Sequence, residues 1–100
     1  MAETNKKILS DIIDYIGKCG GNYREWYAGI ASNARTRLFD DHNVDEKNGN
    51  WIFSPAETSN DARAIERVLV ENYGTDGGSG GGDENTNKVY AYKKTCSTKP

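Results

Sequence analysis

The chain has 100 residues, 35% of them hydrophobic, with a net charge of −2 and a sequence pI near 5.3. This length suits one domain that buries about 60–70% of its unfolded surface, so a fold without disulfides or metals is feasible. Because proteins that bind nucleic acid by non-specific phosphate attraction are normally basic, the acidic balance excludes a nucleic-acid coat protein but not a local basic cleft.

Two features of the sequence indicate the cellular compartment: the two cysteines, Cys19 and Cys96, and the N-terminal residues. Residues 1–13 lack the cationic start and apolar run of a secretory signal, and no apolar stretch approaches the ~20 residues that cross a bilayer. We therefore expect a cytoplasmic protein with reduced thiols and no membrane partner. Neither cysteine has a histidine near it in sequence, which disfavours a zinc site.

The first predicted element is an amphipathic helix at about residues 4–17. Its apolar residues recur at helical spacing, namely Ile8, Leu9, Ile12, Ile13 and Ile16. Gly17, Gly20 and Gly21 follow and end the helix. Because a helix this short rarely stands alone, we expect it to pack on the protein's own sheet rather than to act as a partner-binding helix.

A strand is predicted at residues 23–31, followed by a helix at about 33–42. Alternation along the strand separates two sets of side chains, with Trp26, Ala28 and Ile30 on one face and Tyr27, Gly29 and Ala31 on the other. Ser32 or Asn33 can cap the helix at its N-terminus. The apolar contribution of this helix is confined to Leu38 and Phe39.

The apolar run at 51–53 predicts a second strand, and a third helix is expected at about 59–73. N-cap residues for this helix are available at 58–60, and Gly74 provides its C-terminal stop. Its buried stripe consists of Ala62, Ile65, Leu69 and Tyr73.

A glycine-rich connection, residues 74–87, leads to a final strand at 88–94. The connection lacks the G-K-[ST] ending and the following helix of a phosphate-binding loop, so we interpret it as a flexible link. The whole chain, 1–100, is predicted to be a single α+β domain. It should consist of a small three-stranded antiparallel sheet flanked by about three helices.

Three residues could carry chemistry: Tyr27, Arg37 and Glu66. Tyr27 shares a strand face with Gly29, whose missing side chain would leave room for a phosphate or a water. Arg37, ten residues later, carries a guanidinium that can grip two phosphate oxygens. Glu66 lies at the margin of a buried helix face, where a carboxylate needs a partner such as a divalent metal.

Each of these residues also has a structural interpretation. Tyr27 could be an ordinary amphipathic strand residue. Arg37 and Asp41 are four residues apart and could form a surface pair on the helix. Glu66 could reach solvent or pair with a neighbouring basic side chain. Only the order and spacing of the three residues favour a shared site.

That order resembles the GIY-YIG nuclease domain. The resemblance covers roughly residues 24–70 and rests on three short motifs: W-Y-A-G-I-A at 26–31, R-L-F-x-x-H at 37–42 and A-x-x-I-E-R-V-L at 62–69. In this family a Y-x-G strand leads into a helix bearing R-L and then a His or Tyr, and a later helix carries a metal-binding Glu. The matching residues are Tyr27 and Gly29, Arg37 and Leu38, and Glu66.

One departure from the family concerns its first strand, which carries G-I-Y and should precede the Y-x-G strand. A helix occupies that place here, and the Y-I-G at 15–17 lies at the end of this helix. The segment 88–92, with Tyr90, has the apolar–Tyr pattern of the missing strand. We therefore hypothesise a circularly permuted domain, in which residues 88–93 pair with 24–31.

A second departure concerns His42. The family's His or Tyr lies four residues after the Arg, whereas His42 follows Arg37 by five and lies about 140° away around an ideal helix. His42 reaches the site only if the helix ends or distorts near residue 40. Its structural alternative is a histidine at a helix C-terminus, where the helix dipole favours it.

The resemblance implies metal-dependent phosphodiester hydrolysis on nucleic acid, DNA rather than RNA. Glu66 would hold Mg²⁺ or Mn²⁺, and Arg37 would neutralise charge on the phosphate. Tyr90 or Tyr27 would orient or deprotonate the attacking water. His42 completes the set of catalytic candidates.

The alternative is a non-catalytic module that keeps this scaffold and binds a protein or nucleotide, as an inhibitor or adaptor that a virus could encode. The acidic balance, the shifted His42 and the lack of an appended DNA-binding domain favour this alternative. A small interaction domain with an accidental resemblance is a third possibility.

Overall fold

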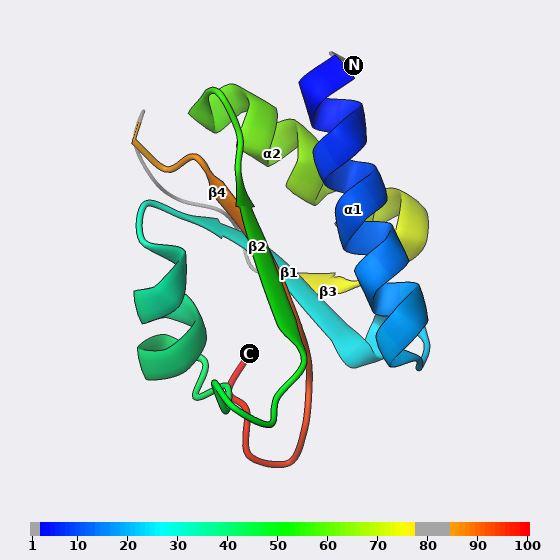
Figure 1. Ribbon diagram of the computed structural model, residues 1–100, viewed down its shortest axis with the longest axis vertical. Coiled ribbons are helices and arrows are strands. Elements are labelled where there is room, and N and C mark those ends of the chain that lie inside the picture. The colour runs from blue at the N-terminus through cyan, green and yellow to red at the C-terminus, as the bar shows by residue number, and fades with distance from the viewer. Residues whose placement is uncertain (1–2, 78–84) are drawn as a thin grey trace.

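The computed structural model describes residues 3–77 and 85–100, which form an α+β fold around one mixed sheet (Figure 1). Within these residues there are two α-helices, a 3₁₀ turn, two π-helical segments and four strands. In chain order the elements are α1 (Glu3–Cys19), the 3₁₀ turn η1 (Tyr23–Glu25), β1 (Trp26–Ala31), the π-helical η2 (Thr36–Asp41), β2 (Trp51–Pro55), α2 (Ser59–Val68), the π-helical η3 (Leu69–Tyr73), β3 (Asp76–Gly77) and β4 (Lys88–Lys93).

The sheet has the strand order β2-β4-β1-β3. Strand β4 is antiparallel to both β1 and β2, as predicted for a three-stranded antiparallel sheet, but β3 adds a fourth strand parallel to β1. The prediction missed β3 because two residues, one of them glycine, carry no alternating pattern. A Cβ on Gly77 would lie 2.7 Å from Cγ2 of Val70 and 3.2 Å from the Ala28 carbonyl, so the missing side chain permits this pairing.

The predicted pairing of residues 88–93 with 24–31 is confirmed. Strand β4 lies against β1 over its whole length, from Trp26 opposite Lys93 to Ala31 opposite Lys88. The register sets Gly29 opposite Tyr90, and this pair lies in the middle of the sheet. The last strand in sequence therefore occupies the centre of the fold, between β1 and β2.

One face of the sheet packs against α1 and α2 (Figure 1). The inward residues of β1 are those predicted from alternation, and they form one core with the isoleucines of α1 and the apolar stripe of α2: Ile8, Ile12, Ile16, Trp26, Ala28, Ile30, Ala62 and Ile65. Burial of each large apolar side chain contributes about 1.5–3 kcal/mol. This core therefore explains why α1 packs on its own sheet. Within the described part of the chain, no helix is long and apolar enough to cross a membrane.

The opposite face of the sheet is aromatic and is covered by η2. Its buried residues are Tyr27, Ala31, Ala34, Leu38, Val44, Tyr90 and Tyr92, with Phe39, Trp51 and Phe53 packed at the margin. In Figure 1, η2 lies on the side of the sheet away from α1. The C-terminal residues return to the same side. The two faces thus differ in chemistry, and the strand tyrosines Tyr27, Tyr90 and Tyr92 lie on only one of them.

The predicted helix caps are present. Asn33 accepts a hydrogen bond from the backbone N–H of Thr36 at 3.1 Å, and the hydroxyl of Thr58 accepts one from Asp61 at 3.1 Å. The first strand begins at Trp26 rather than at residue 23, since Tyr23–Glu25 form a 3₁₀ turn.

Two further expectations concern the cysteines and the glycine-rich connection. Cys19 and Cys96 are free thiols. The connection predicted at 74–87 falls largely on residues 78–84, which lie outside the described residues.

Candidate functional site

Strands β1 and β4 bring Tyr27 and Tyr90 together on the aromatic face. Both side chains are almost fully buried, with 9% of Tyr27 and 2% of Tyr90 exposed. Their rings are stacked with centroids 6.4 Å apart, and the ring of Tyr92 lies 5.3 Å from that of Tyr27. Two tyrosines that are 63 positions apart in sequence thus share one site, because β4 pairs with β1.

The space predicted beside Gly29 is not open to a phosphate. A Cβ added at Gly29 would lie 2.5 Å from the hydroxyl oxygen of Tyr90 and 2.6 Å from its Cζ atom. The aromatic ring of Tyr90 therefore fills the space above the glycine. The prediction of a free volume was wrong because a single strand cannot reveal which side chain its neighbour places there. Gly29 is needed for the close approach of Tyr90.

His42 reaches the site because the helix before it widens. Residues 36–41 form a π-helix rather than the predicted α-helix, and the backbone N–H of His42 donates to the carbonyl of Arg37, five residues earlier, at 2.9 Å. The turn closes one residue later than in an α-helix, which carries His42 towards the sheet. Short π-helical turns occur frequently at functional sites. The distortion required for His42 is therefore present.

The imidazole of His42 is 6% exposed and makes hydrogen bonds at both nitrogens. Its Nε2 atom lies 2.7 Å from the Tyr90 hydroxyl. Its Nδ1 atom lies 2.7 Å from the backbone carbonyl oxygen of Lys99 and 3.1 Å from the Tyr92 hydroxyl. The Tyr27 ring packs against the imidazole with centroids 4.7 Å apart. His42 is thus the centre of a buried tyrosine cluster.

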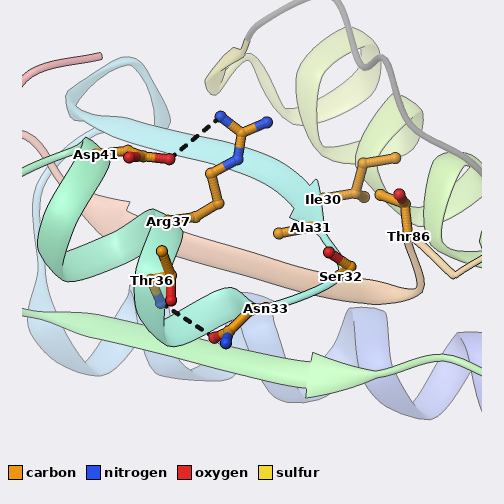
Figure 2. Close-up of a pocket in the computed structure, with 8 residues that line it drawn as sticks. All are labelled: Ile30, Ala31, Ser32, Asn33, Thr36, Arg37, Asp41 and Thr86. Atoms are coloured by element: carbon orange, nitrogen blue, oxygen red, sulfur yellow. Dashed lines mark hydrogen bonds and ion pairs between the residues drawn. The ribbon is translucent and has the colours of Figure 1, made fainter.

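Arg37 lines a pocket at the edge of this cluster (Figure 2). The pocket has a volume of about 320 Å³, and its lining is mainly polar: Ile30, Ala31, Ser32, Asn33, Thr36, Arg37, Asp41 and Thr86. Strand β1 forms its floor and η2 forms one wall. Hydroxyl groups and a guanidinium around one opening make it suitable for an anion.

The predicted pair between Arg37 and Asp41 is also present. Nη1 of Arg37 lies 3.6 Å from Oδ2 of Asp41, and both side chains are about half exposed. An exposed pair of this kind contributes only about 0–1 kcal/mol. A phosphate can therefore compete with Asp41 for the guanidinium at modest cost. Arg35, by contrast, pairs with Glu46 and lies over the rings of Phe39 and Trp51, away from the pocket.

Glu66 projects from α2 and is half-buried. Burial raises the pKa of its carboxyl, while the positive charges of Arg63 and Arg67 lower it. The raised pKa means that the carboxylate lacks full compensation for its lost hydration. A cation held against it would provide that compensation.

Burial also raises the pKa of Tyr90, and the neighbouring Tyr27 adds to the rise. The charge of Arg37 opposes this shift, and the charge of Glu66 adds to it. The Tyr90 hydroxyl therefore lies within the electrostatic reach of both residues. Burial raises the pKa of Tyr92 in the same way. Both hydroxyls keep their protons at neutral pH.

Glu66 could contribute one carboxylate to the coordination of a divalent metal. Among residues 3–77 and 85–100, no group of three or more histidine, cysteine or acidic side chains could enclose a metal ion. Magnesium is commonly held by one or two carboxylates, with water and substrate phosphate oxygens completing its coordination. The half-buried Glu66 carboxylate meets this requirement, but it does not define a preformed metal cage.

Comparison of the chain with protein-family models, with curated proteins and with solved structures finds no match. The site must therefore be interpreted from its own geometry. Tyr27, Tyr90 and His42 are in contact, Arg37 lies at the neighbouring pocket, and Glu66 acts on Tyr90 through its charge.

The sequence interpretation missed Tyr92 and the Lys99 carbonyl. The alternation of residues 88–93 places Tyr92 on the same face as Tyr90, so this pattern could have identified it. The Lys99 contact is made by the backbone, and no side-chain pattern encodes it.

Proposed function

We propose that this chain is a circularly permuted, GIY-YIG-like phosphodiester hydrolase that acts on nucleic acid with the help of a divalent metal. One observation carries the proposal: the Tyr90 hydroxyl, on the strand that pairs with β1, is hydrogen-bonded to Nε2 of His42 at 2.7 Å. The same hydroxyl is subject to the charges of Arg37 and Glu66. Three residues suggested by the resemblance, His42, Arg37 and Glu66, thus bear on a single oxygen atom, that of Tyr90.

Arg37 binds the scissile phosphate in this proposal. Its guanidinium lines the polar pocket, where it can donate two hydrogen bonds to non-bridging oxygens. Charge that develops on these oxygens during hydrolysis would be stabilised by the same donors. Asp41 holds the guanidinium until substrate arrives and is displaced at little cost, because the pair is exposed.

Tyr90 and His42 move the proton of the attacking water. Burial keeps Tyr90 protonated in the resting protein, so its hydroxyl cannot act as a base by itself. His42 provides the acceptor: as Tyr90 takes a proton from water, it passes its own proton to Nε2. The ring of Tyr27 packs on His42 and keeps the imidazole oriented towards the Tyr90 hydroxyl.

Glu66 would hold Mg²⁺ or Mn²⁺ together with water and phosphate oxygens. The bound metal would supply charge neutralisation at the phosphate and at the leaving oxygen. The protein contributes a half-buried carboxylate whose pKa is raised by burial. DNA is proposed as the substrate, and its target could be selected by a separate partner, since the chain is acidic overall.

A second candidate function is a non-catalytic module that binds a nucleotide or a phosphorylated partner through the same pocket. The burial of Tyr27, Tyr90 and His42 favours it, because none of the three lines the pocket. In this case Arg37 and the surrounding hydroxyls bind the phosphate, and the tyrosine cluster is structural.

A cleavage assay separates the two functions. Supercoiled plasmid and labelled duplex oligonucleotide are incubated with the full chain and Mg²⁺ or Mn²⁺, and the wild type is compared with Glu66→Gln and Arg37→Ala. Two matched controls test for general damage: Glu71→Gln, at an exposed position of η3, and Arg35→Ala, on the same helical segment as Arg37.

The hydrolase proposal expects metal-dependent cleavage that falls by about 10²–10³-fold in both site variants and stays within about twofold of the wild type in both controls. Cleavage that persists unchanged in Glu66→Gln and Arg37→Ala overturns the assignment of the site. A wild type that binds the oligonucleotide through Arg37 without cleaving it supports the binding module instead.

A further inference from the structure

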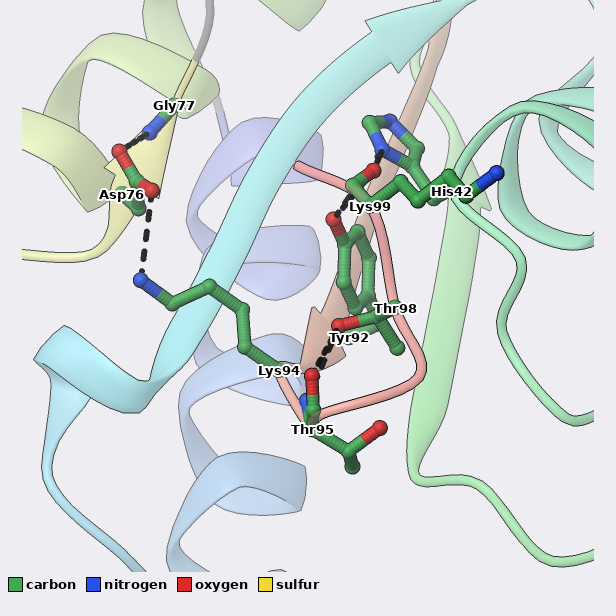
Figure 3. A network of polar contacts seen from close by, with 8 residues as sticks. All are labelled: His42, Asp76, Gly77, Tyr92, Lys94, Thr95, Thr98 and Lys99. Carbon is green, nitrogen blue, oxygen red and sulfur yellow. Dashed lines mark hydrogen bonds and ion pairs between the residues drawn. The ribbon is translucent and has the colours of Figure 1, made fainter.

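The C-terminal residues run back along the aromatic face and end beside His42 (Figure 3). Two hydrogen bonds, to residues 42 and 43, hold them there, and a third closes a turn within the segment. The backbone N–H of Lys99 donates to the carbonyl of His42 at 2.7 Å, Nδ2 of Asn43 donates to the Ser97 carbonyl at 3.0 Å, and the Thr98 hydroxyl donates to the Thr95 carbonyl at 3.1 Å. The carbonyl of Lys99 is thereby directed at the imidazole.

We propose that the backbone carbonyl of Lys99 positions His42 by fixing its imidazole as the Nδ1–H tautomer. The carbonyl oxygen lies 2.7 Å from Nδ1. A carbonyl oxygen can only accept a hydrogen bond, so a contact this short requires the proton to be on Nδ1. A neutral imidazole carries one ring proton, which leaves Nε2 with its lone pair.

This assignment decides the direction of the hydrogen bond at the other end of the ring. With Nε2 unprotonated, the Tyr90 hydroxyl must be the donor in the 2.7 Å contact. Nε2 is then ready to accept the Tyr90 proton. In the opposite tautomer Nε2–H would donate to Tyr90, and His42 could not accept a proton from it. The Lys99 carbonyl thus sets which ring nitrogen is basic.

Tyr92 does not determine the tautomer. Its hydroxyl lies 3.1 Å from Nδ1 and can either donate or accept there, so it is compatible with both tautomers. The Lys99 carbonyl oxygen, by contrast, can only accept a hydrogen bond and is therefore compatible with only one tautomer. Once Nδ1 is protonated, its N–H donates to both the Lys99 carbonyl oxygen and the Tyr92 hydroxyl oxygen. The Tyr92 hydroxyl in turn donates to the Lys99 oxygen at 3.5 Å.

The catalytic consequence rests on the proposed function, but the tautomer can be measured without substrate. His42 is the only histidine in the chain, so a two-bond ¹H–¹⁵N correlation spectrum of the labelled full chain contains one imidazole. At about pH 8 we expect Nδ1 to be protonated and Nε2 to be unprotonated. Free histidine favours the opposite tautomer. A protonated Nε2 in the wild type overturns the proposal.

Two variants test whether Lys99 is the cause. A chain that ends at Cys96 lacks the carbonyl altogether. The variant Asn43→Gly/Thr98→Ala loosens the segment without shortening it, and glycine suits position 43 because Asn43 has a positive φ of 57°. In each variant we expect the Nε2–H tautomer to become the major form. Retention of the Nδ1–H tautomer in folded protein overturns the role of Lys99.

Tyr92→Phe is the matched control, because it removes the other group near Nδ1 and leaves the Lys99 carbonyl in place. The Nδ1–H tautomer should remain, and a reversal here would assign the effect to Tyr92 instead. Cleavage is measured in parallel on the loosened variant. We expect kcat to fall by about 10–100-fold, part of the 10²–10⁴-fold that general base catalysis contributes. If the tautomer changes and kcat of the cleaving enzyme stays the same, the positioning role of Lys99 is contradicted. A chain that does not cleave contradicts only the proposed function.

Discussion

The hydroxyl of Tyr90 lies 2.7 Å from Nε2 of His42, although the two residues are 48 positions apart in sequence. Two separate features of the fold create this contact. Strand β4 enters the centre of the sheet and brings Tyr90 beside β1, and the π-helical turn carries His42 onto the same face. The contact therefore depends on both the last strand and the distorted helix. A substitution at either residue tests the assembled site.

Tyr90→Phe should abolish cleavage while leaving the fold intact. The change removes one hydroxyl from a buried ring and leaves Nε2 of His42 without its partner. We expect a fall in kcat of about 10²–10⁴-fold and a loss of about 1–3 kcal/mol in the free energy of unfolding. Urea denaturation monitored by far-UV circular dichroism measures the stability, and plasmid cleavage measures the activity.

Tyr73→Phe is the control for this prediction. Tyr73 is 37% exposed at the end of η3, so the loss of its hydroxyl should change the unfolding free energy by less than about 0.5 kcal/mol and leave cleavage unaffected. Equal cleavage activity in Tyr90→Phe and the wild type would remove Tyr90 from the mechanism.

Gly29→Ala should destabilise the protein through Tyr90. The added methyl group would lie 2.5 Å from the Tyr90 hydroxyl oxygen, closer than van der Waals contact allows. Tyr90 must then shift and lose its hydrogen bond to His42. We expect a loss of about 1–3 kcal/mol in the free energy of unfolding, measured by urea denaturation.

Gly17→Ala provides the opposite case. Gly17 lies within α1, and a Cβ there meets no atom within 4 Å. Since alanine favours the helix over glycine by about 0.5–1 kcal/mol, this variant should be more stable than the wild type. A Gly29→Ala variant that is as stable as the wild type, or more stable, would contradict the close approach of Tyr90 to Gly29.

The sequence predicted the core face of the sheet more reliably than the site. Alternation in residues 23–31 assigned Trp26 and Tyr27 to opposite faces, and the structure agrees, because burial of one face enforces a period of two. The pairing of β4 with β1 was also predicted, from the apolar–Tyr pattern at 88–92.

The remaining features of the site depend on contacts that no local pattern records. The π-helical turn before His42 differs from an α-helix by one backbone step, and the residues of 36–41 suit either form. The ring of Tyr90 fills the space above Gly29 because of the inter-strand register. The Lys99 contact uses a carbonyl that every residue possesses. These features are therefore visible only in the folded structure.

Arg37→Ala should weaken the binding of a duplex oligonucleotide, because Arg37 is the guanidinium that lines the polar pocket. A hydrogen bond to a charged group contributes about 1.5–3 kcal/mol, so we expect Kd to rise by about 10–100-fold. The slope of the logarithm of the association constant against the logarithm of the salt concentration should also decrease in magnitude by about one. Fluorescence anisotropy over a salt series, in Ca²⁺ to prevent cleavage, measures both quantities.

Asp41→Asn tests the same pocket from the opposite side. Asp41 competes with the phosphate for Arg37 across 3.6 Å, so its neutralisation should tighten oligonucleotide binding by a few-fold. Arg35→Ala serves as the control, because Arg35 pairs with Glu46 and does not line the pocket. A loss of affinity in Arg35→Ala as large as in Arg37→Ala would indicate diffuse attraction rather than a site.

The buried tyrosines should make the protein less stable at alkaline pH. Burial raises the pKa of Tyr90 above its value in the unfolded chain, about 10, and the charge of Tyr27 adds to the rise. Between these two pKa values the folded state retains a proton that the unfolded state has lost. The stabilisation is therefore complete below about pH 10 and is lost as the pH rises towards the folded-state pKa.

Urea denaturation at about pH 8 and about pH 11 measures this loss, with Tyr90→Phe as the test and Tyr73→Phe as the control. The unfolding free energy of the wild type should fall between the two pH values, and the fall should be smaller in Tyr90→Phe, since phenylalanine cannot ionise. Tyr73→Phe should behave like the wild type, because its hydroxyl lies on an exposed ring. An equal fall in all three proteins would mean that burial does not raise the pKa of Tyr90 in the folded state.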